Sequence, residues 1–441
     1  MTLDEALATL SQFGHAVVVV RDADGYPLSV ATSFRVEGRT LRLDSARAGN
    51  GTMRDGVEAR VICSRIRPRP GYGYDQRSYV ELGGVLHITG DQWVLDPSVA
   101  RGWSEDRIPF LELCERALPQ ARRYLAALSS QRGVAVTPRM SLGWRFFLAT
   151  RLPFLTATLV PVFLGIAAAG LDHHFSWWLA LLTLVGAVAV HLGLNVANDI
   201  FDARSGADEV NTTPTMFSGG SRVIQYGLVT PRQMLIICAV CYAIAIGIGI
   251  ALVAISGLGL LWLGLAGVLI SWFYTAPPLR LVHRGLGELA VALGFGPIMV
   301  LGAYYVQTGH YALRPGVLSI PVALLVMLIL YANEIPDRIA DARVGKRTLV
   351  VRLAPAAVVG GYEFVAAAAY AAFVVGVAVR LLPPATLIAL LTIPLAWRAA
   401  RGLRQNYDDP YAVMPALQTN VLLHLATGVL LVAGTLIGLA G

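Results

Sequence analysis

Long apolar stretches fill the last two-thirds of the chain. A helix needs about 20 apolar residues to cross the hydrocarbon core of a bilayer, and several stretches approach or exceed that length. They lie near 152–170, 177–197, 233–255, 257–274, 288–307, 316–333, 356–380, 382–398 and 418–440. The pattern predicts a transmembrane bundle of about nine helices. Some of them contain Pro or Gly, which favours local breaks.

Residues before about 135 follow a different pattern, with short runs in which apolar and polar positions alternate. Examples are 15–22 (HAVVVVRD) and 79–90 (YVELGGVLHITG), and turn signals such as Asp24-Gly25 separate the runs. This pattern predicts a small soluble antiparallel barrel, closed by a helix over 106–128. We therefore expect three parts, listed as a barrel domain over 1–135, a linker over 136–150 and a transmembrane domain over 151–441.

Composition and charge agree with a membrane protein. The chain is 56% apolar and 14% charged, with a net charge of +7. Around the apolar stretches, fifteen basic residues fall on one side of the predicted membrane, whereas only Arg314 and Arg380 fall on the other. The basic side of a membrane protein faces the cytoplasm. The arginine excess thus indicates orientation in the inner or plasma membrane, with the barrel domain and both acidic clusters in the cytoplasm, and no nucleic-acid partner is expected.

Two acidic clusters follow apolar stretches, at 195–208 (NVANDIFDARSGAD) and at 333–341 (NEIPDRIAD). Carboxylates at the ends of membrane helices are costly unless they face an ion or a polar cavity. Asn333, Asp337 and Asp341 recur every fourth residue, as Asn198 and Asp202 do, so each set lies on one helical face. The spacing predicts that two oxygen-rich faces hold a divalent cation between them.

The donor atoms and the nearby cations favour a particular ligand. Asn and Asp oxygens without His or Cys suit Mg²⁺, which commonly completes its coordination shell with phosphate oxygens. Arg222, Lys346 and Arg347 follow the clusters and can take up the negative charge of a departing diphosphate. A diphosphate at the membrane surface with an apolar cavity behind it describes a polyprenyl diphosphate whose tail enters the lipid bilayer.

Three segments resemble signature sequences of the UbiA superfamily of intramembrane prenyltransferases. They are 198–208 (NDIFDARSGAD), 274–280 (YTAPPLR) and 333–353 (NEIPDRIADARVGKRTLVVRL), and the resemblance covers roughly 145–441. Within the superfamily, the chain is most similar to the 1,4-dihydroxy-2-naphthoate polyprenyltransferases of menaquinone biosynthesis. The segments that carry this similarity are 284–289 (RGLGEL), 302–309 (GAYYVQTG) and 219–227 (GGSRVIQYG).

The resemblance implies a role for each matching residue. Arg222, Lys346 and Arg347 would hold phosphate oxygens, and the catalytic residues would be Asp202, Asp337 and Tyr274. The side chain of Tyr274 would steady the allyl cation that forms when the diphosphate leaves. The implied magnesium ligands are Asn198, Asp199, Asp202, Asp208, Asn333, Asp337 and Asp341.

The acceptor that the resemblance implies is a hydroxylated aromatic acid. Arg280 or Arg284 would pair with its carboxylate. Arg151, at the start of the first apolar stretch, could reach the acceptor or anchor the helix at the lipid headgroups, and we favour the anchor. The third acid of the first motif stands at Asp208, whereas some members of the family have it at the position of Gly206. This shifted form occurs in the naphthoate branch, and it leaves the role of Asp208 open.

Two alternative functions use the same residues. The acceptor could be another quinone precursor such as 4-hydroxybenzoate. Paired acids on membrane helices also serve cation-coupled carriers, although transport does not require a phosphate-binding basic loop beside each acidic cluster.

The N-terminal runs resemble the flavin-binding split barrel of the pyridoxamine-phosphate-oxidase-like families. The segments that carry the resemblance are 22–27 (DADGYP) and 43–61. It implies that Ser45, Arg47 and Asn50 meet the phosphate of FMN. Related barrels bind F420 or haem instead, and the simplest alternative is a cofactor-free module that docks on the cytoplasmic side.

Overall fold

The structure is a computed structural model, and it divides into two compact units, Met1–Cys114 and Glu115–Gly441. The residues that it describes are 1–21, 27–44, 55–68, 74–89, 92–138, 140–211 and 213–439. These units are defined by contacts within the folded chain. The domain limits at 135 and 151 were drawn from sequence composition, and they stay predictions.

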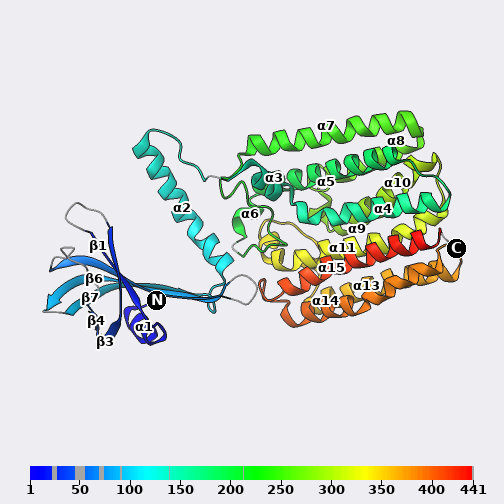
Figure 1. Ribbon diagram of the computed structural model, residues 1–441. Coiled ribbons are helices and arrows are strands. Elements are labelled where there is room, and N and C mark those ends of the chain that lie inside the picture. The colour runs from blue at the N-terminus through cyan, green and yellow to red at the C-terminus, as the bar shows by residue number, and fades with distance from the viewer. Residues whose placement is uncertain are drawn as a thin grey trace. The chain divides into compact units, whose positions relative to one another are not determined.

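The first unit contains a short helix and a curled antiparallel sheet (Figure 1). Helix α1 spans Leu3–Thr9, where Thr2 and Glu5 form a capping box, and a 3-10 turn, η1, follows at Leu10–Gln12. The strand order is β2-β1-β5-β6-β7-β4-β3, and each neighbouring pair is antiparallel. The strands are β1 (Ala16–Arg21), β2 (Pro27–Thr32), β3 (Phe34–Glu37), β4 (Thr40–Asp44), β5 (Val57–Pro68), β6 (Tyr74–Thr89) and β7 (Gln92–Ser104).

Alternation along the strands builds the core of this unit. In β1, Val18 is fully buried and Val17 is half-buried, and Val18 pairs with Val61 of β5. Leu82 of β6 and Leu95 of β7 are also fully buried in the same cluster. The predicted antiparallel β-domain is confirmed, and within the described residues β2 and β3 are the two edges of a half-barrel. The prediction that a helix over 106–128 closes it is wrong, because that helix, α2, belongs from Glu115 onward to the second unit. Ser45, Arg47 and Asn50 lie outside the described residues.

The second unit is helical (Figure 1). Its amphipathic helix α2 (Phe110–Arg132) begins before the unit boundary. Short elements connect the longer helices: α3 (Leu142–Thr150), η2 (Leu152–Leu155), α6 (Ala207–Val210), η3 (Leu281–Arg284), α12 (Leu349–Arg352) and η5 (Pro384–Thr392). The remaining elements are α4 (Thr156–Leu171), α5 (Trp177–Ser205), α7 (Pro231–Ser256), α8 (Gly259–Phe273), α9 (Gly287–Leu293), η4 (Gly294–Ile298), α10 (Met299–Thr308), α11 (Leu313–Arg343), α13 (Pro355–Ala378), α14 (Ile393–Asn406) and α15 (Met414–Ile437).

The membrane bundle agrees with the predicted spans. In the described part of the chain, eight continuous helical segments are long and apolar enough to cross a bilayer. The ninth predicted span is α8, which has only 15 residues. Several spans combine consecutive elements, and α9, η4 and α10 form one of them over Gly287–Thr308. The π-helical turn η4 contains Pro297, whose missing N–H accounts for the local break.

Helix α11 is the most enclosed span, and it carries the second acidic cluster at its end. Leu318, Val322 and Leu328 of α11 are fully buried, and they pack in clusters with residues of α4, α13 and α15. A Cβ atom added at Gly296 would lie 2.3 Å from the Cβ of Ala323, so η4 approaches α11 too closely for a side chain. This close packing sets the separation between η4 and the first half of α11.

Candidate active site

The two acidic clusters form the ends of α5 and α11, and these ends face one polar cavity of about 170 Å³. Both helices continue beyond their apolar stretches through the clusters, so the spacing of four residues does place the oxygen atoms on one face of each helix. Five of the predicted metal ligands line the cavity: Asn198, Asp202, Asn333, Asp337 and Asp341.

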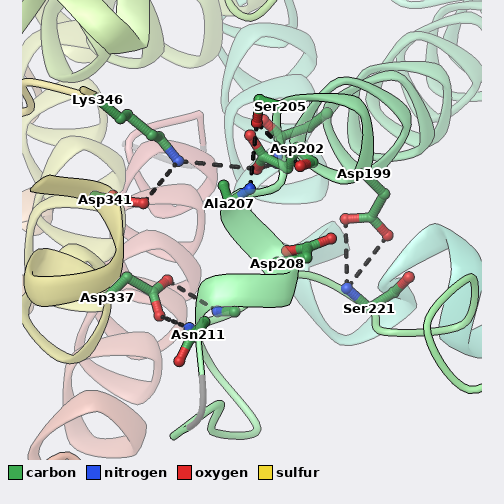
Figure 2. Close-up of polar contacts among 12 residues, drawn as sticks. Asp199, Asp202, Ser205, Ala207, Asp208, Asn211, Ser221, Asp337, Asp341 and Lys346 are labelled. Carbon is green, nitrogen blue, oxygen red and sulfur yellow. Dashed lines mark hydrogen bonds and ion pairs between the residues drawn. The ribbon is translucent and has the colours of Figure 1, made fainter. Parts of the chain in front are cut away.

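The loop between α6 and α7 connects the two helix ends. The side chain of Asn211 donates to one oxygen of Asp337 at 2.8 Å, and the backbone N–H of Gly219 donates to the other at 2.8 Å (Figure 2). On α5, the amide of Asn198 donates to Asp202 at 3.1 Å. Asp337 is therefore oriented by the loop, and Asp202 by its own helix.

Lys346 links the clusters electrostatically. Its amine lies 3.8 Å from a carboxylate oxygen of Asp202 and 3.5 Å from one of Asp341 (Figure 2). Burial disfavours the charged amine, but the attraction of Asp202 and Asp341 outweighs it and raises the pKa of Lys346 well above its ordinary value. The cavity thus contains an amine that forms ion pairs with an acid of each helix end.

Asp199 and Asp208 do not line this cavity, but they share a neighbouring position. Figure 2 shows Asp208, on α6, between the acids of α5 and those of α11. The backbone N–H of Ser221 lies 3.3 and 3.2 Å from the two carboxylate oxygens of Asp199. The amide of Gln225 donates to Asp208 at 3.1 Å. Burial, followed by repulsion from Asp202 and Asp199, raises the pKa of Asp208 to about 8.

The donor atoms fit a hard cation. Oxygen Oδ1 of Asp202 and Oδ1 of Asn333 are buried and have no hydrogen-bond partner in the part of the chain that the structure describes, although buried polar atoms normally have one. Among the described residues, no three acidic, His or Cys side chains already converge as a metal-binding group. Mg²⁺ is usually held by one or two carboxylates together with water and substrate phosphates. The arrangement agrees with such an incomplete protein shell.

A second, apolar cavity of about 600 Å³ lies beside the polar one. Residues of α5, α7, α8 and α10 line it. His191, Tyr274 and Phe295 line both cavities, so they form a common wall. Nδ1 of His191 lies 2.7 Å from the hydroxyl of Thr158, and its buried Nε2 has no partner within the described ranges.

Four predicted cations are placed elsewhere. Arg222 bonds to the carboxylate of Glu115 and to the backbone carbonyl of Asp208, and it does not line the polar cavity. Arg280, Arg284 and Arg347 are exposed and are not among the residues that line either cavity. Their predicted roles stay predictions.

Some residues that line the site were not assigned to it from the sequence. Arg151, interpreted as a headgroup anchor rather than as a contact to the acceptor, lines the polar cavity, and its guanidinium lies 3.5 Å from the carbonyl of Phe217. Glu334 and His191 also line the cavity. Glu334 lies within the second acidic cluster, which is a usable signal in the sequence. A single His within an apolar stretch gives no such signal, because it more often marks a packed core position.

Together, the bundle, the oxygen-rich helix ends and the adjoining apolar cavity define a membrane-embedded enzyme for a substrate with a charged head and a lipid tail. The chain belongs to the UbiA prenyltransferase family, whose model matches residues 158–435, and it is a prenyltransferase. The predicted membership is thereby confirmed. Residues 1–157, including α2, lie outside the match.

Curated relatives have similar sequences. The 1,4-dihydroxy-2-naphthoate octaprenyltransferase of Mycobacterium tuberculosis is 34% identical over 283 residues, which cover 64% of this chain and 93% of that protein. The Bacillus subtilis protein of the same name is 29% identical over 306 residues, covering 69% and 96%. A solved UbiA homolog from Aeropyrum pernix has a TM-score of 0.49 at 19% identity, over 63% of this chain and 97% of that one.

Proposed function

We propose that this protein transfers a polyprenyl group from its diphosphate to 1,4-dihydroxy-2-naphthoate in menaquinone biosynthesis, with Mg²⁺ as cofactor. Curated relatives at about 30% identity bear the name of this activity. The basic residues around the spans favour an active site that opens to the cytoplasm, where both polar substrates would be available.

One observation carries the proposal: the polar and apolar cavities share a wall. A polyprenyl diphosphate has a head of several negative charges and a long hydrocarbon tail. The polar cavity provides metal-type oxygen donors and Lys346 for the head, and the apolar cavity of about 600 Å³ provides room for the tail. A carrier for small ions has no use for the second cavity.

The acids of both helix ends would hold the metal. Asp202 and Asp337 would be its principal ligands, because they line the cavity from two different helices. Asn198, Asn333 and Asp341 would complete this set, with Asp199 and Asp208 beside it. Bound Mg²⁺ would supply Lewis-acid assistance to the departing diphosphate.

Lys346 and Tyr274 would act on opposite sides of the allylic C–O bond, Lys346 on the diphosphate and Tyr274 on the prenyl carbon. The buried amine of Lys346 would neutralise charge on the phosphate oxygens as the allylic C–O bond breaks. Tyr274 lines the junction of the two cavities, where the first carbon of the tail must lie. Its aromatic ring would stabilise positive charge at that carbon.

The acceptor would enter beside Arg151, the arginine that lines the polar cavity, and its carboxylate would pair with the guanidinium. Diphosphate would leave as the allylic C–O bond breaks, and the carboxylated ring carbon would then bond to the allylic carbon. The C–CO₂ bond would break last and return its electron pair to the ring. Arg280 and Arg284 remain the predicted alternative, and they would have to reach the acceptor from the exposed side.

The N-terminal sheet would lie in the cytoplasm, as the charge distribution predicts. FMN binding by this sheet stays a prediction. Flavin absorbance of the purified full chain would support it, and its absence after growth with riboflavin would favour the cofactor-free module.

The direct test uses purified full-length protein in lipid nanodiscs with Mg²⁺, labelled polyprenyl diphosphate and one aromatic acid at a time. We expect prenylated product and released CO₂ with 1,4-dihydroxy-2-naphthoate, and none when EDTA removes the metal. Product from 4-hydroxybenzoate alone would move the acceptor assignment to that acid. No product with any acid, together with cation uptake into proteoliposomes, would establish the carrier instead.

A further inference from the structure

Helix α2 precedes the family-matched region, yet it bonds directly to the loop of the active site. Glu115, in the first half of α2, is buried and accepts hydrogen bonds from the guanidinium of Arg222 and from the hydroxyl of Tyr226. Both donors belong to the loop between α6 and α7. A buried Arg–Glu pair is costly to break, because either partner alone leaves an uncompensated charge.

A second contact from α2 reaches the same loop. Nε of Arg122 donates to the backbone carbonyl of Gln225 at 3.1 Å, and its Nη2 donates to the same oxygen. Gln225 is itself buried, and its side-chain amide donates to the carboxylate of Asp208. Arg222 donates to the backbone carbonyl of Asp208. Arg222 and Gln225, two of the loop residues that α2 contacts, therefore each bond directly to Asp208.

The same loop touches the other acids. Its residue Gly219 donates to Asp337, and its residue Ser221 donates to Asp199. At Gly220, with a φ of +71°, the backbone passes so close that an added Cβ would lie 3.0 Å from Asp208 and 3.3 Å from Asp199. The position of the loop thus sets the orientation of three carboxylates.

We propose that α2 is a clamp for the magnesium site: through Glu115 and Arg122 it holds the loop between α6 and α7, which in turn orients Asp199, Asp208 and Asp337. Glu115 and Arg122 are positioning residues, because neither lines the polar cavity. The inference rests on the proposed metal site and adds to it a control element from outside the family-matched domain. Residues that orient metal ligands typically change metal affinity or activity by roughly 10- to 100-fold.

The test uses the purified full chain and four variants. Glu115→Ala removes both bonds of the carboxylate, and Glu115→Gln keeps a hydrogen-bond acceptor without the charge. Arg122→Ala removes the second contact, and it leaves no buried charge behind because Arg122 is exposed. Arg123→Ala is the matched control, since Arg123 is the next residue of α2 and is also exposed.

Two readouts separate positioning from general destabilisation. Binding of Mn²⁺, a spectroscopic substitute for Mg²⁺, is measured by electron paramagnetic resonance without any substrate. Turnover is then measured against Mg²⁺ concentration and, separately, against aromatic acid concentration. The Tm without metal shows whether each variant is folded.

We expect Glu115→Ala and Arg122→Ala to weaken Mn²⁺ binding and to raise the Mg²⁺ concentration for half-maximal turnover by about tenfold or more. The KM for the aromatic acid should stay within about twofold. The Mn²⁺ affinity of Glu115→Gln should lie between those of Glu115→Ala and the wild type. The affinity of Arg123→Ala should match that of the wild type. If Glu115→Ala fails to fold, Arg122→Ala decides the matter.

Unchanged Mn²⁺ affinity in folded Arg122→Ala and Glu115→Gln would overturn the clamp while leaving the proposed function intact. A lower Tm with unchanged metal affinity would show that α2 only stabilises the fold. Absence of Mn²⁺ binding in the wild type would overturn the clamp and the metal site together.

Discussion

Gly220 offers a sharp test of how the loop supports the acids. Its φ of +71° lies in the left-handed region, where any other residue costs about 1–2 kcal/mol. Gly227 of the same loop has a φ of +68°, so Gly227→Ala has the same backbone cost. The two sites differ in their surroundings, because a Cβ at Gly227 meets nothing within 4 Å.

The Cβ of Gly220→Ala would instead lie 3.0 Å from Asp208 and 3.3 Å from Asp199, closer than ordinary van der Waals contact. Both carboxylates, or the loop, must therefore move by a few tenths of an ångström. We expect the two variants to lose similar thermal stability, about 1–2 kcal/mol of unfolding free energy. Gly220→Ala should in addition lose about 10- to 100-fold in Mg²⁺ affinity or turnover.

The assay compares both variants in nanodiscs, with the Tm measured first and turnover then measured over a range of Mg²⁺ concentrations. Gly227→Ala should retain turnover within about threefold of the wild type. Equal losses in the two variants would refute the reasoning, because they would trace the effect to the backbone alone and not to the displaced acids.

Three further predictions concern the cavities. Asp202→Ala and Asp337→Ala should each lower turnover by more than about 100-fold while the protein stays inserted and folded, and full activity in either would remove that residue from the metal site. Gly302→Phe, at an open position of the apolar cavity, should raise the KM for long prenyl donors more than for geranyl diphosphate, whereas an equal rise for both would place the tail elsewhere. Arg151→Gln should raise the KM for the aromatic acid about tenfold, whereas Arg284→Gln should leave it unchanged. The opposite result would show that Arg284, and not Arg151, pairs with the acceptor carboxylate.

Regular spacing made the helix ends predictable from the sequence. Asn333, Asp337 and Asp341 share a face because an α-helix returns to the same side after about four residues, and apolar length located the spans. The same reasoning gave the alternating strands of the N-terminal sheet. Where the backbone is a regular helix or strand, the spacing of residues in the sequence determines the direction in which their side chains point.

Loop residues lack such a period, so their directions depend on contacts distant in the sequence. Arg222 was expected at the diphosphate because it is a cation near an acidic cluster, but Glu115, more than a hundred residues earlier, holds its guanidinium. Arg151 lines the cavity because its left-handed conformation, with a φ of 53°, ends α3 there. Neither placement follows from local pattern, since each is decided by tertiary packing.

The central claim is that the ends of α5 and α11 share one metal with the diphosphate. Pulsed electron–nuclear double resonance on Mn²⁺-loaded protein with an unreactive prenyl thiolodiphosphate measures this directly. We predict phosphorus hyperfine coupling to Mn²⁺ that is lost in Asp202→Ala, on α5, and equally in Asp337→Ala, on α11. Coupling that persists in either variant, or that is missing in the wild type, would contradict the account.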